Sequence, residues 1–184
     1  MIMSEICDRY ESMRSCRQDV ADVFRHHGGR LDRVRDIANS IAGEIENLSA
    51  FIQQHTAVVC PECTSVCCAN RHSMHTFDDI VFIYALGEQI PLHTPGLDDS
   101  RPCQFLGELG CVIPRVVRPY RCNWYFCSPL LNRITELNTV RHYRMFIDLL
   151  QKITRGRQRL MEEYSSEVKG IGRAPIKRDN FLYY

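Results

Sequence analysis

Residues 31–52 have the sequence LDRVRDIANSIAGEIENLSAFI, in which an apolar side chain recurs every three or four positions. This spacing gives a helix one continuous apolar face. Residues 4–27 show the same spacing, and Gly28-Gly29 separates the two segments. Because two amphipathic helices joined by a short connection commonly bury their faces against each other, we expect an antiparallel helical hairpin over residues 1–56.

A third amphipathic pattern lies near the C-terminus. Its broad apolar face predicts a long helix within residues 133–168. The face is formed by Val140, Tyr143, Phe146, Ile147, Leu150, Ile153, Met161 and Tyr164. The tail at 169–184 shows no such periodicity. A chain of 184 residues matches the length of one domain. We therefore expect a single, mostly α domain in which the hairpin and the C-terminal helix form a scaffold.

Composition and charge exclude several classes of protein. Hydrophobic residues make up 45% of the chain and charged residues 24%, which is ordinary globular usage. A net charge of +1 argues against a nucleic-acid partner or an electrostatic membrane surface. The longest apolar run, Ile80 to Leu86, is too short to cross a bilayer, and the first residues lack the basic start of a secretory signal. We expect a cytoplasmic protein with no membrane partner.

The middle of the chain, residues 57–132, is rich in cysteine, proline and glycine. Eight of the ten cysteines lie there: Cys60, Cys63, Cys67, Cys68, Cys103, Cys111, Cys122 and Cys127. One helix is expected after Thr76, where Thr76-Phe-Asp-Asp79 resembles a capping box. In a reducing compartment, clustered cysteines more often bind metal than form disulfides. Since so little regular structure is expected here, bound metal would hold this unit together.

The cysteine spacing suggests how the thiols would bind metal. In Cys60-Pro-Glu-Cys63, the Cys-x-x-Cys spacing lets two thiolates meet at one ion. The adjacent side chains of Cys67 and Cys68 point in different directions and more naturally serve two metal positions. Eight thiols suffice for two four-sulfur sites, and one four-cysteine cluster with four accessory thiols is the alternative. Spacing alone does not separate zinc from an iron–sulfur cluster.

Three arginines lie among the later cysteines, at positions 115, 118 and 121. Four thiolates around a doubly charged ion or cluster leave two negative charges that need hydrogen bonds or cations nearby. We expect Arg118 and Arg121 in particular to contribute to cofactor binding by compensating this charge.

The block from about residue 58 to 130 resembles the CxxCxxCC family, the YkgJ-type zinc- or iron-chelating domains. The matching features are the eight cysteines in order, Asp78-Asp79-Ile80 at a helix start, Cys103-Gln-Phe-Leu106, Cys111-Val-Ile113 and Arg118-Pro119-Tyr-Arg-Cys122. One extra residue separates Cys63 from Cys67, and another separates Cys111 from the Arg-Pro pair. The resemblance implies a metal-chelating protein that holds an iron–sulfur cluster, such as 4Fe-4S, or zinc.

Two other functions stay open at this point. Related domains occur in flagellin lysine methylases, so the resemblance also implies an iron–sulfur-dependent protein methyltransferase as an alternative. The second alternative is a structural zinc module that presents its basic C-terminal helix to a partner, through Arg155, Arg157 and Arg159.

Overall fold

The chain is mostly helical, as expected, in a computed structural model that describes residues 2–63, 67–108, 110–137 and 140–172. Side chains are described from Met13 onward, with the exception of residue 137. The α-helices are α1 (Ile2–His27), α2 (Asp32–Val59), α3 (Phe77–Ala85), α4 (Arg121–Trp124), α5 (Ser128–Leu137) and α6 (Val140–Gly170). Two-residue strands β1 (Leu106–Gly107) and β2 (Gly110–Cys111) pair antiparallel, and 3₁₀ turns cover Gly28–Arg30, Asn70–His72 and Arg115–Val117.

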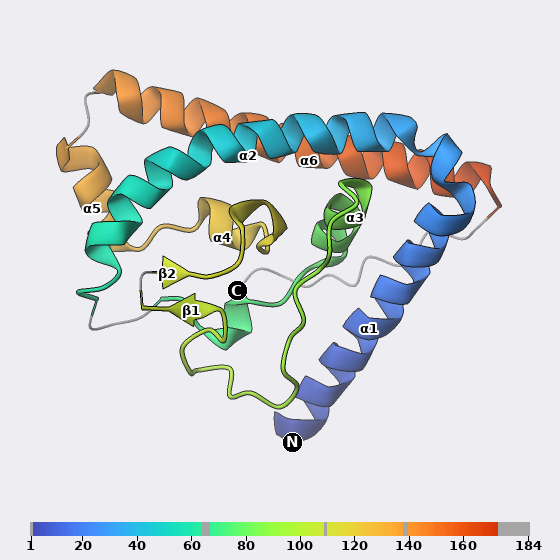
Figure 1. Cartoon of the computed structure of the whole chain (residues 1–184), viewed down its shortest axis with the longest axis horizontal. Helices are drawn as coiled ribbons and strands as arrows, with labels where there is room; N and C mark the ends of the chain where they lie inside the picture. The colour runs from blue at the N-terminus through green and yellow to red at the C-terminus, as the bar shows by residue number, and fades with distance from the viewer. Residues whose placement is uncertain (1, 64–66, 109, 138–139, 173–184) are drawn as a thin grey trace.

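The two N-terminal helices diverge instead of lying side by side as a hairpin. Gly28–Arg30 joins them as expected, but α1 then runs away from α2 at a wide angle (Figure 1). Helix α1 packs on α3, whereas α2 lies along α6 for much of its length. The reason is that the apolar face of α2 is covered by the longer apolar face of α6, which leaves α1 to cover α3.

A glycine allows the close approach of α2 and α6. A Cβ atom built on Gly156 of α6 would lie 2.8 Å from Cγ1 of Ile41, which is 3% exposed on α2. Any side chain at position 156 would therefore push the two helices apart or displace a core residue. The long C-terminal helix that the sequence predicts is thus confirmed, and it is the main packing partner of α2.

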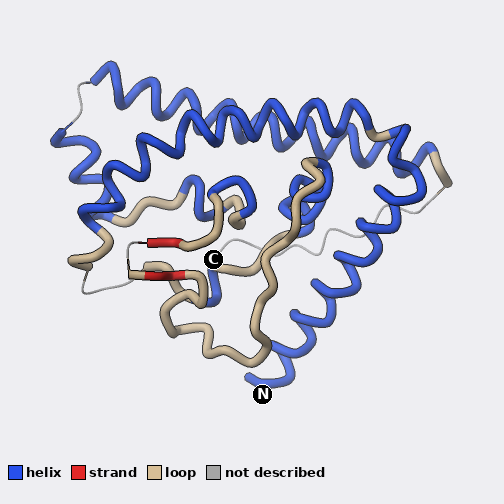
Figure 2. Tube along the Cα trace, viewed as in Figure 1, coloured by secondary structure: helices blue, strands red, loops and turns tan. Residues whose placement is uncertain are grey.

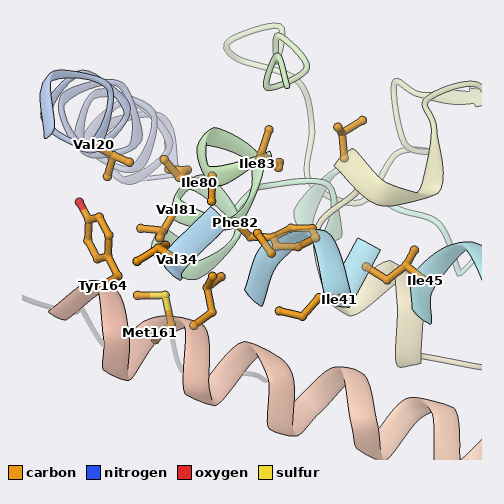
Figure 3. Packing of buried hydrophobic residues seen from close by; sticks show 14 of the residues in the cluster. Val20, Val34, Ile41, Ile45, Ile80, Val81, Phe82, Ile83, Met161 and Tyr164 are labelled. Atoms are coloured by element: carbon orange, nitrogen blue, oxygen red, sulfur yellow. The ribbon is translucent and has the colours of Figure 1, made fainter. Parts of the chain in front are cut away.

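The short helix α3 lies at the centre of the core. Its residues Ile80, Val81, Phe82 and Ile83 are all buried, and Figure 3 shows them between Val20 of α1, the α2 side chains and Tyr164 of α6. The predicted capping box begins this helix, since the Thr76 side chain accepts a hydrogen bond from the backbone of Asp79. A helix buried on nearly all sides needs this apolar composition.

The segment expected as one helix over 133–168 is divided. Helix α5 begins at Ser128 and ends at Leu137, and α6 begins at Val140 and runs to Gly170. Helix α5 therefore starts within the expected cysteine-rich unit, and it contacts the C-terminal part of α2 (Figure 1). Residues 173–184 of the expected tail lie outside the described residues.

The cysteine-rich segment contains little regular structure. Figure 2 shows mostly loop between α3 and α4, interrupted by the short strand pair. None of the helices in the described part of the chain combines the length and apolar character needed for a membrane span.

Candidate metal centre

The eight predicted cysteines come from separate pieces of backbone. Cys60 caps the C-terminus of α2, and the Cys63 amide donates to the Cys60 carbonyl at 3.2 Å, which forms the turn of the Cys-x-x-Cys motif. Cys111 lies on β2, Cys122 on α4, and Cys127 immediately before α5. No disulfide joins any of these eight within the described residues; Cys68 is exposed and the other seven are half-buried.

Four of these thiols are electrostatic neighbours, and we call them the first thiol set: Cys60, Cys63, Cys67 and Cys127. Burial raises the pKa of Cys60, and the charges of the other three members raise it further. A hydrogen bond joins the Cys67 and Cys127 side chains. The end of α2 and the start of α5, which contact each other, thereby bring residues 60 and 127 together.

The other four thiols form the second thiol set: Cys68, Cys103, Cys111 and Cys122. Burial raises the pKa of Cys122 to about 12, with further increases from Cys111 and Cys103. Cys68 lies near Cys122 and Cys103, and also near Cys60 of the first set. The two sets meet at the Cys67–Cys68 peptide, where the neighbouring thiols share a hydrogen bond that raises the pKa of Cys67 and lowers that of Cys68.

Backbone pairing and a buried asparagine hold the second set in place. The Cys103 amide donates to the Cys68 carbonyl at 2.8 Å, next to an isolated bridge between Ala69 and Pro102. Asn70 is 7% exposed; its side chain donates to the Asp98 carbonyl at 3.0 Å and accepts from the Gln104 amide at 2.8 Å. Sequence reasoning missed Asn70, because an asparagine in a loop is common and only its contacts show that it links two segments.

The thiols are neighbours without forming a closed coordination shell. Among the described residues, no three His, Cys, Asp or Glu side chains lie close enough together to hold a metal ion between them. Raised pKa values for Cys60, Cys67, Cys103, Cys122 and Cys127 mean that these thiols are protonated at neutral pH when only other thiols surround them. A bound cation would favour the thiolate and draw the sulfurs inward.

Two of the three predicted arginines contact the backbone of the second set. Arg118 donates from Nε to the Ile113 carbonyl at 2.8 Å and from Nη2 to the Cys111 carbonyl at 3.2 Å. Arg115 is 7% exposed and donates from Nη1 to the Cys122 carbonyl at 3.3 Å. Burial and the nearby Arg118 lower the pKa of Arg115 to about 10, while Cys122 and Cys111 act in the opposite direction.

In the part of the chain that the structure describes, these two guanidinium groups have no carboxylate partner. None of the ion pairs found in the described ranges includes Arg115 or Arg118. A buried cation such as Arg115 is costly without a counter-charge, so an anionic group is expected nearby. Arg121, the other arginine predicted to compensate charge, lies instead over the Tyr125 ring, 5.4 Å from its centroid. The structure thus brings Arg115 and Arg118 to the second thiol set.

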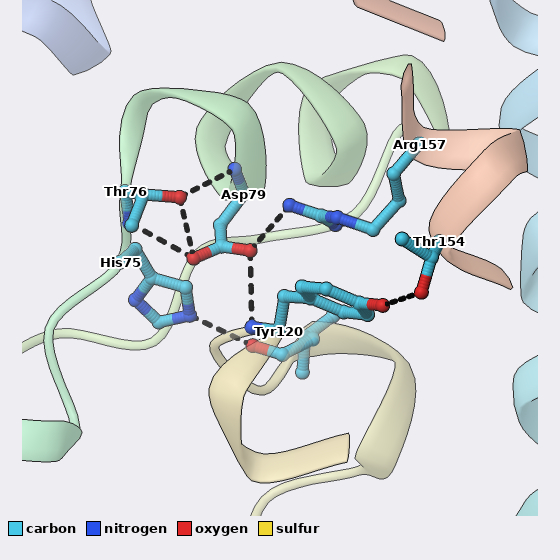
Figure 4. Close-up of polar contacts among 7 residues, drawn as sticks. His75, Thr76, Asp79, Tyr120, Thr154 and Arg157 are labelled. Atoms are coloured by element: carbon cyan, nitrogen blue, oxygen red, sulfur yellow. Dashed lines mark hydrogen bonds and ion pairs between the residues drawn. The ribbon is translucent and has the colours of Figure 1, made fainter. Parts of the chain in front are cut away.

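A buried carboxylate ties this part of the chain to the helical core (Figure 4). Oδ1 of Asp79 accepts from the Tyr120 amide at 3.0 Å and from Nη2 of Arg157 at 2.6 Å, while Oδ2 accepts from Thr76. The Arg157 guanidinium also lies 4.6 Å from the centroid of the Tyr120 ring. Tyr120 precedes Cys122 by two residues, so the Asp79–Arg157 pair fixes the backbone that carries this thiol.

The histidines near the cysteines have other contacts. Nε2 of the buried His75 donates to the Val117 carbonyl at 2.9 Å, and the ring of His72 stacks on Tyr125. Buried His93 packs edge-on against His75 and donates to the Ser73 carbonyl.

Comparison with known proteins adds no relative: no family model matches the chain, and neither a curated protein nor a solved structure does. The thiols, their spacing and the charges around them are therefore the features that point to a function.

Proposed function

We propose that this chain is a metal-chelating protein that holds an iron–sulfur cluster or zinc through up to eight cysteine thiolates. The observation that carries the proposal is the gathering of eight cysteine thiols, from positions 60 to 127, into two neighbouring sets. Thiolate is the ligand that both zinc and iron–sulfur clusters prefer. The order of the cysteines and the Arg118-Pro119 pair resemble the CxxCxxCC family. This resemblance supports a thiolate centre of the kind that the family is expected to hold.

The charge distribution supports an anionic centre. Four thiolates around a doubly charged ion or cluster leave two negative charges. Arg115 and Arg118 supply two positive charges, and among the described residues neither has a carboxylate partner. Of the two kinds of centre we favour the iron–sulfur cluster, because eight thiols exceed the need of a single structural zinc ion. Within the described ranges, no contact favours the methyltransferase alternative.

The proposal is tested by anaerobic purification of the full chain, followed by elemental analysis and an absorption spectrum. Iron and acid-labile sulfide with a broad band near ~400 nm would identify a cluster, and a colourless protein with bound zinc would identify zinc–thiolate sites. A chain that binds neither metal after anaerobic reconstitution with iron and sulfide, or with zinc, would overturn the proposal.

The structure changes the alternative of a partner-binding basic helix. Arg155 and Arg159 are exposed on α6, but Arg157 is 7% exposed and pairs with Asp79 in the core. An effect of mutating Arg157 on partner binding would therefore report loss of core structure. A partner surface on α6 would involve the exposed arginines only.

A further inference from the structure

We infer that the first half of α6 is a docking surface for an acidic helical segment of a partner protein. The surface is a row of positively charged side chains, which we call the basic row: Arg141, Arg144, Lys152, Arg155 and Arg159. All members of the row are exposed. The inference goes beyond the proposed function and does not depend on it, because no cysteine belongs to the row.

The basic row lies on one face of α6. Its members recur close to whole turns of a helix, which takes about 3.6 residues per turn, so their side chains share one side. The opposite side faces the core, where Phe146, Ile153 and Arg157 are buried. A helix rises about 1.5 Å per residue, so the row from Arg141 to Arg159 is about 27 Å long. In Figure 1 the orange start of α6 lies along the upper edge of the molecule.

Neighbouring elements leave most of this positive charge without compensation. Among the described residues, no ion pair includes an arginine of the basic row, and Lys152 approaches Glu44 only to 4.0 Å. The reason lies in α2, whose residues 47–59 include no Asp, Glu, Lys or Arg. This uncharged part of α2 is the part beside the start of α6, because the ring centroids of Phe51 and Phe146 lie 5.0 Å apart. Helix α5 carries one arginine and one glutamate, which cancel each other.

The second half of α6 is different, because its acidic side chains have partners within the chain. Glu163 lies 3.4 Å from Arg33 of α2, and Glu167 lies 3.4 Å from Arg30 in the turn before α2. The unbalanced charge of α6 is therefore confined to its first half. Exposed charge of one sign on a rigid element attracts and orients a partner of the opposite sign.

The other side chains on this face favour a protein segment over a nucleic acid or a lipid surface. Exposed Asp148 lies between Arg144 and Lys152, where it would repel a continuous line of phosphates, whereas a protein segment can place a neutral or basic side chain opposite it. Val140 and Met145, 69% and 54% exposed, offer apolar contacts to such a segment. The apolar face of α6 is buried in the core, so this helix cannot insert it into a bilayer as interfacial helices do. A helix with a carboxylate every three or four residues repeats with the same period as the row and can meet it along its length.

The test uses a synthetic helical peptide as the probe on the full chain. The peptide has about 20 residues, enough to cover the row, with its glutamates in one row at three- and four-residue spacing. A second peptide has the same composition, but its glutamates are distributed around the helix. Affinity is measured by fluorescence anisotropy over a series of salt concentrations.

Two double variants with the same change in net charge are compared. The test variant carries Arg144→Glu and Arg155→Glu, within the basic row. The control variant carries Arg14→Glu on α1 and Lys169→Glu near the end of α6, at exposed positions outside the row. Circular dichroism and thermal unfolding check that both variants keep the helical fold.

We expect the peptide with one glutamate row to bind more tightly than the second peptide, and its affinity to fall as salt rises. The test variant should bind the first peptide about 10- to 100-fold more weakly, because each reversal replaces an attraction with a repulsion. The control variant should bind it as the unmodified chain does.

Several results would overturn the inference. No binding of the first peptide would remove the docking surface, and equal affinity for the two peptides would mean that only net charge is recognised. Equal losses in the test and control variants would lead to the same conclusion. Tighter binding of duplex DNA, or of phosphatidylcholine vesicles that contain phosphatidylserine, would assign the row to a phosphate-bearing partner if the test variant alone loses it. Metal content, measured in the same samples, reports on the proposed function separately.

Discussion

Removal of the Asp79 carboxylate tests how the core holds the cysteine-bearing loops. The Asp79 and Arg157 side chains are 2% and 8% exposed, and their charged atoms lie 2.6 Å apart. Truncation to alanine would leave the guanidinium buried without a counter-charge, a change that costs about 3–5 kcal/mol in comparable pairs. Loss of the capping box adds about 1 kcal/mol. We therefore expect Asp79→Ala to lower the free energy of unfolding by about 4 kcal/mol, a large part of a typical domain's stability.

The assay is urea unfolding followed by circular dichroism at a fixed metal concentration. Asp78→Asn is the control, since it removes a carboxylate from the same first turn of α3. A double-mutant cycle with Arg157→Met isolates the pair. Because Arg157→Met removes the unpaired charge, the double variant should be about 2 kcal/mol more stable than the sum of the single losses predicts. A loss below about 1 kcal/mol for Asp79→Ala, or additive losses in the cycle, would refute the role given to this pair.

Further predictions concern pH and packing. Burial lowers the pKa of His93 from 6.5 to about 4, so the unfolded state binds more protons between these values. The free energy of unfolding should therefore rise by about 3 kcal/mol from pH 4 to pH 6.5 and level off above that. In urea unfolding, His93→Gln should show a flatter dependence on pH than the unmodified chain. Identical pH profiles for the two proteins would contradict the prediction. Gly156→Val should cost about 2 kcal/mol, because its side chain would overlap Ile41. Gly43→Ala on α2, where a Cβ meets nothing within 4 Å, should raise stability by about 0.5–1 kcal/mol. If thermal unfolding shows that both glycine variants change stability in the same direction, the packing of α2 on α6 is contradicted.

Local sequence patterns predicted the helices well. The apolar spacing from Leu31 to Ile52 and from Phe146 to Tyr164 corresponds to buried faces of α2 and α6, and Thr76 begins α3 with its predicted cap. Helix α5 was not expected as a separate element, although Ser128-Pro129 is a sequence typical of a helix start. Proline is tolerated there because the first amides of a helix have no internal partners.

Long-range packing was harder to predict from the sequence. Amphipathic faces on α1 and α2 are compatible with a hairpin, and nothing local indicates that α6 would cover α2 instead. Arg157 looks like one of several basic residues on a solvated helix face, and only its contact with Asp79 places it in the core. For the candidate centre, the eight cysteines are visible in the sequence, but the expectation that the Cys67 and Cys68 side chains point apart was wrong, since their thiols share a hydrogen bond. The roles of Asn70 and Arg115 depend on segments that are distant in the chain.

X-ray absorption spectroscopy at the metal edge tests the central claim most directly, because it reports the atoms bound to the metal. For the anaerobically purified full chain, we expect a first shell made of sulfur, with metal–sulfur distances of about 2.3 Å. A cluster would add a second shell of iron, and zinc centres would show four sulfurs alone. A first shell dominated by nitrogen or oxygen would contradict thiolate coordination by this group of cysteines.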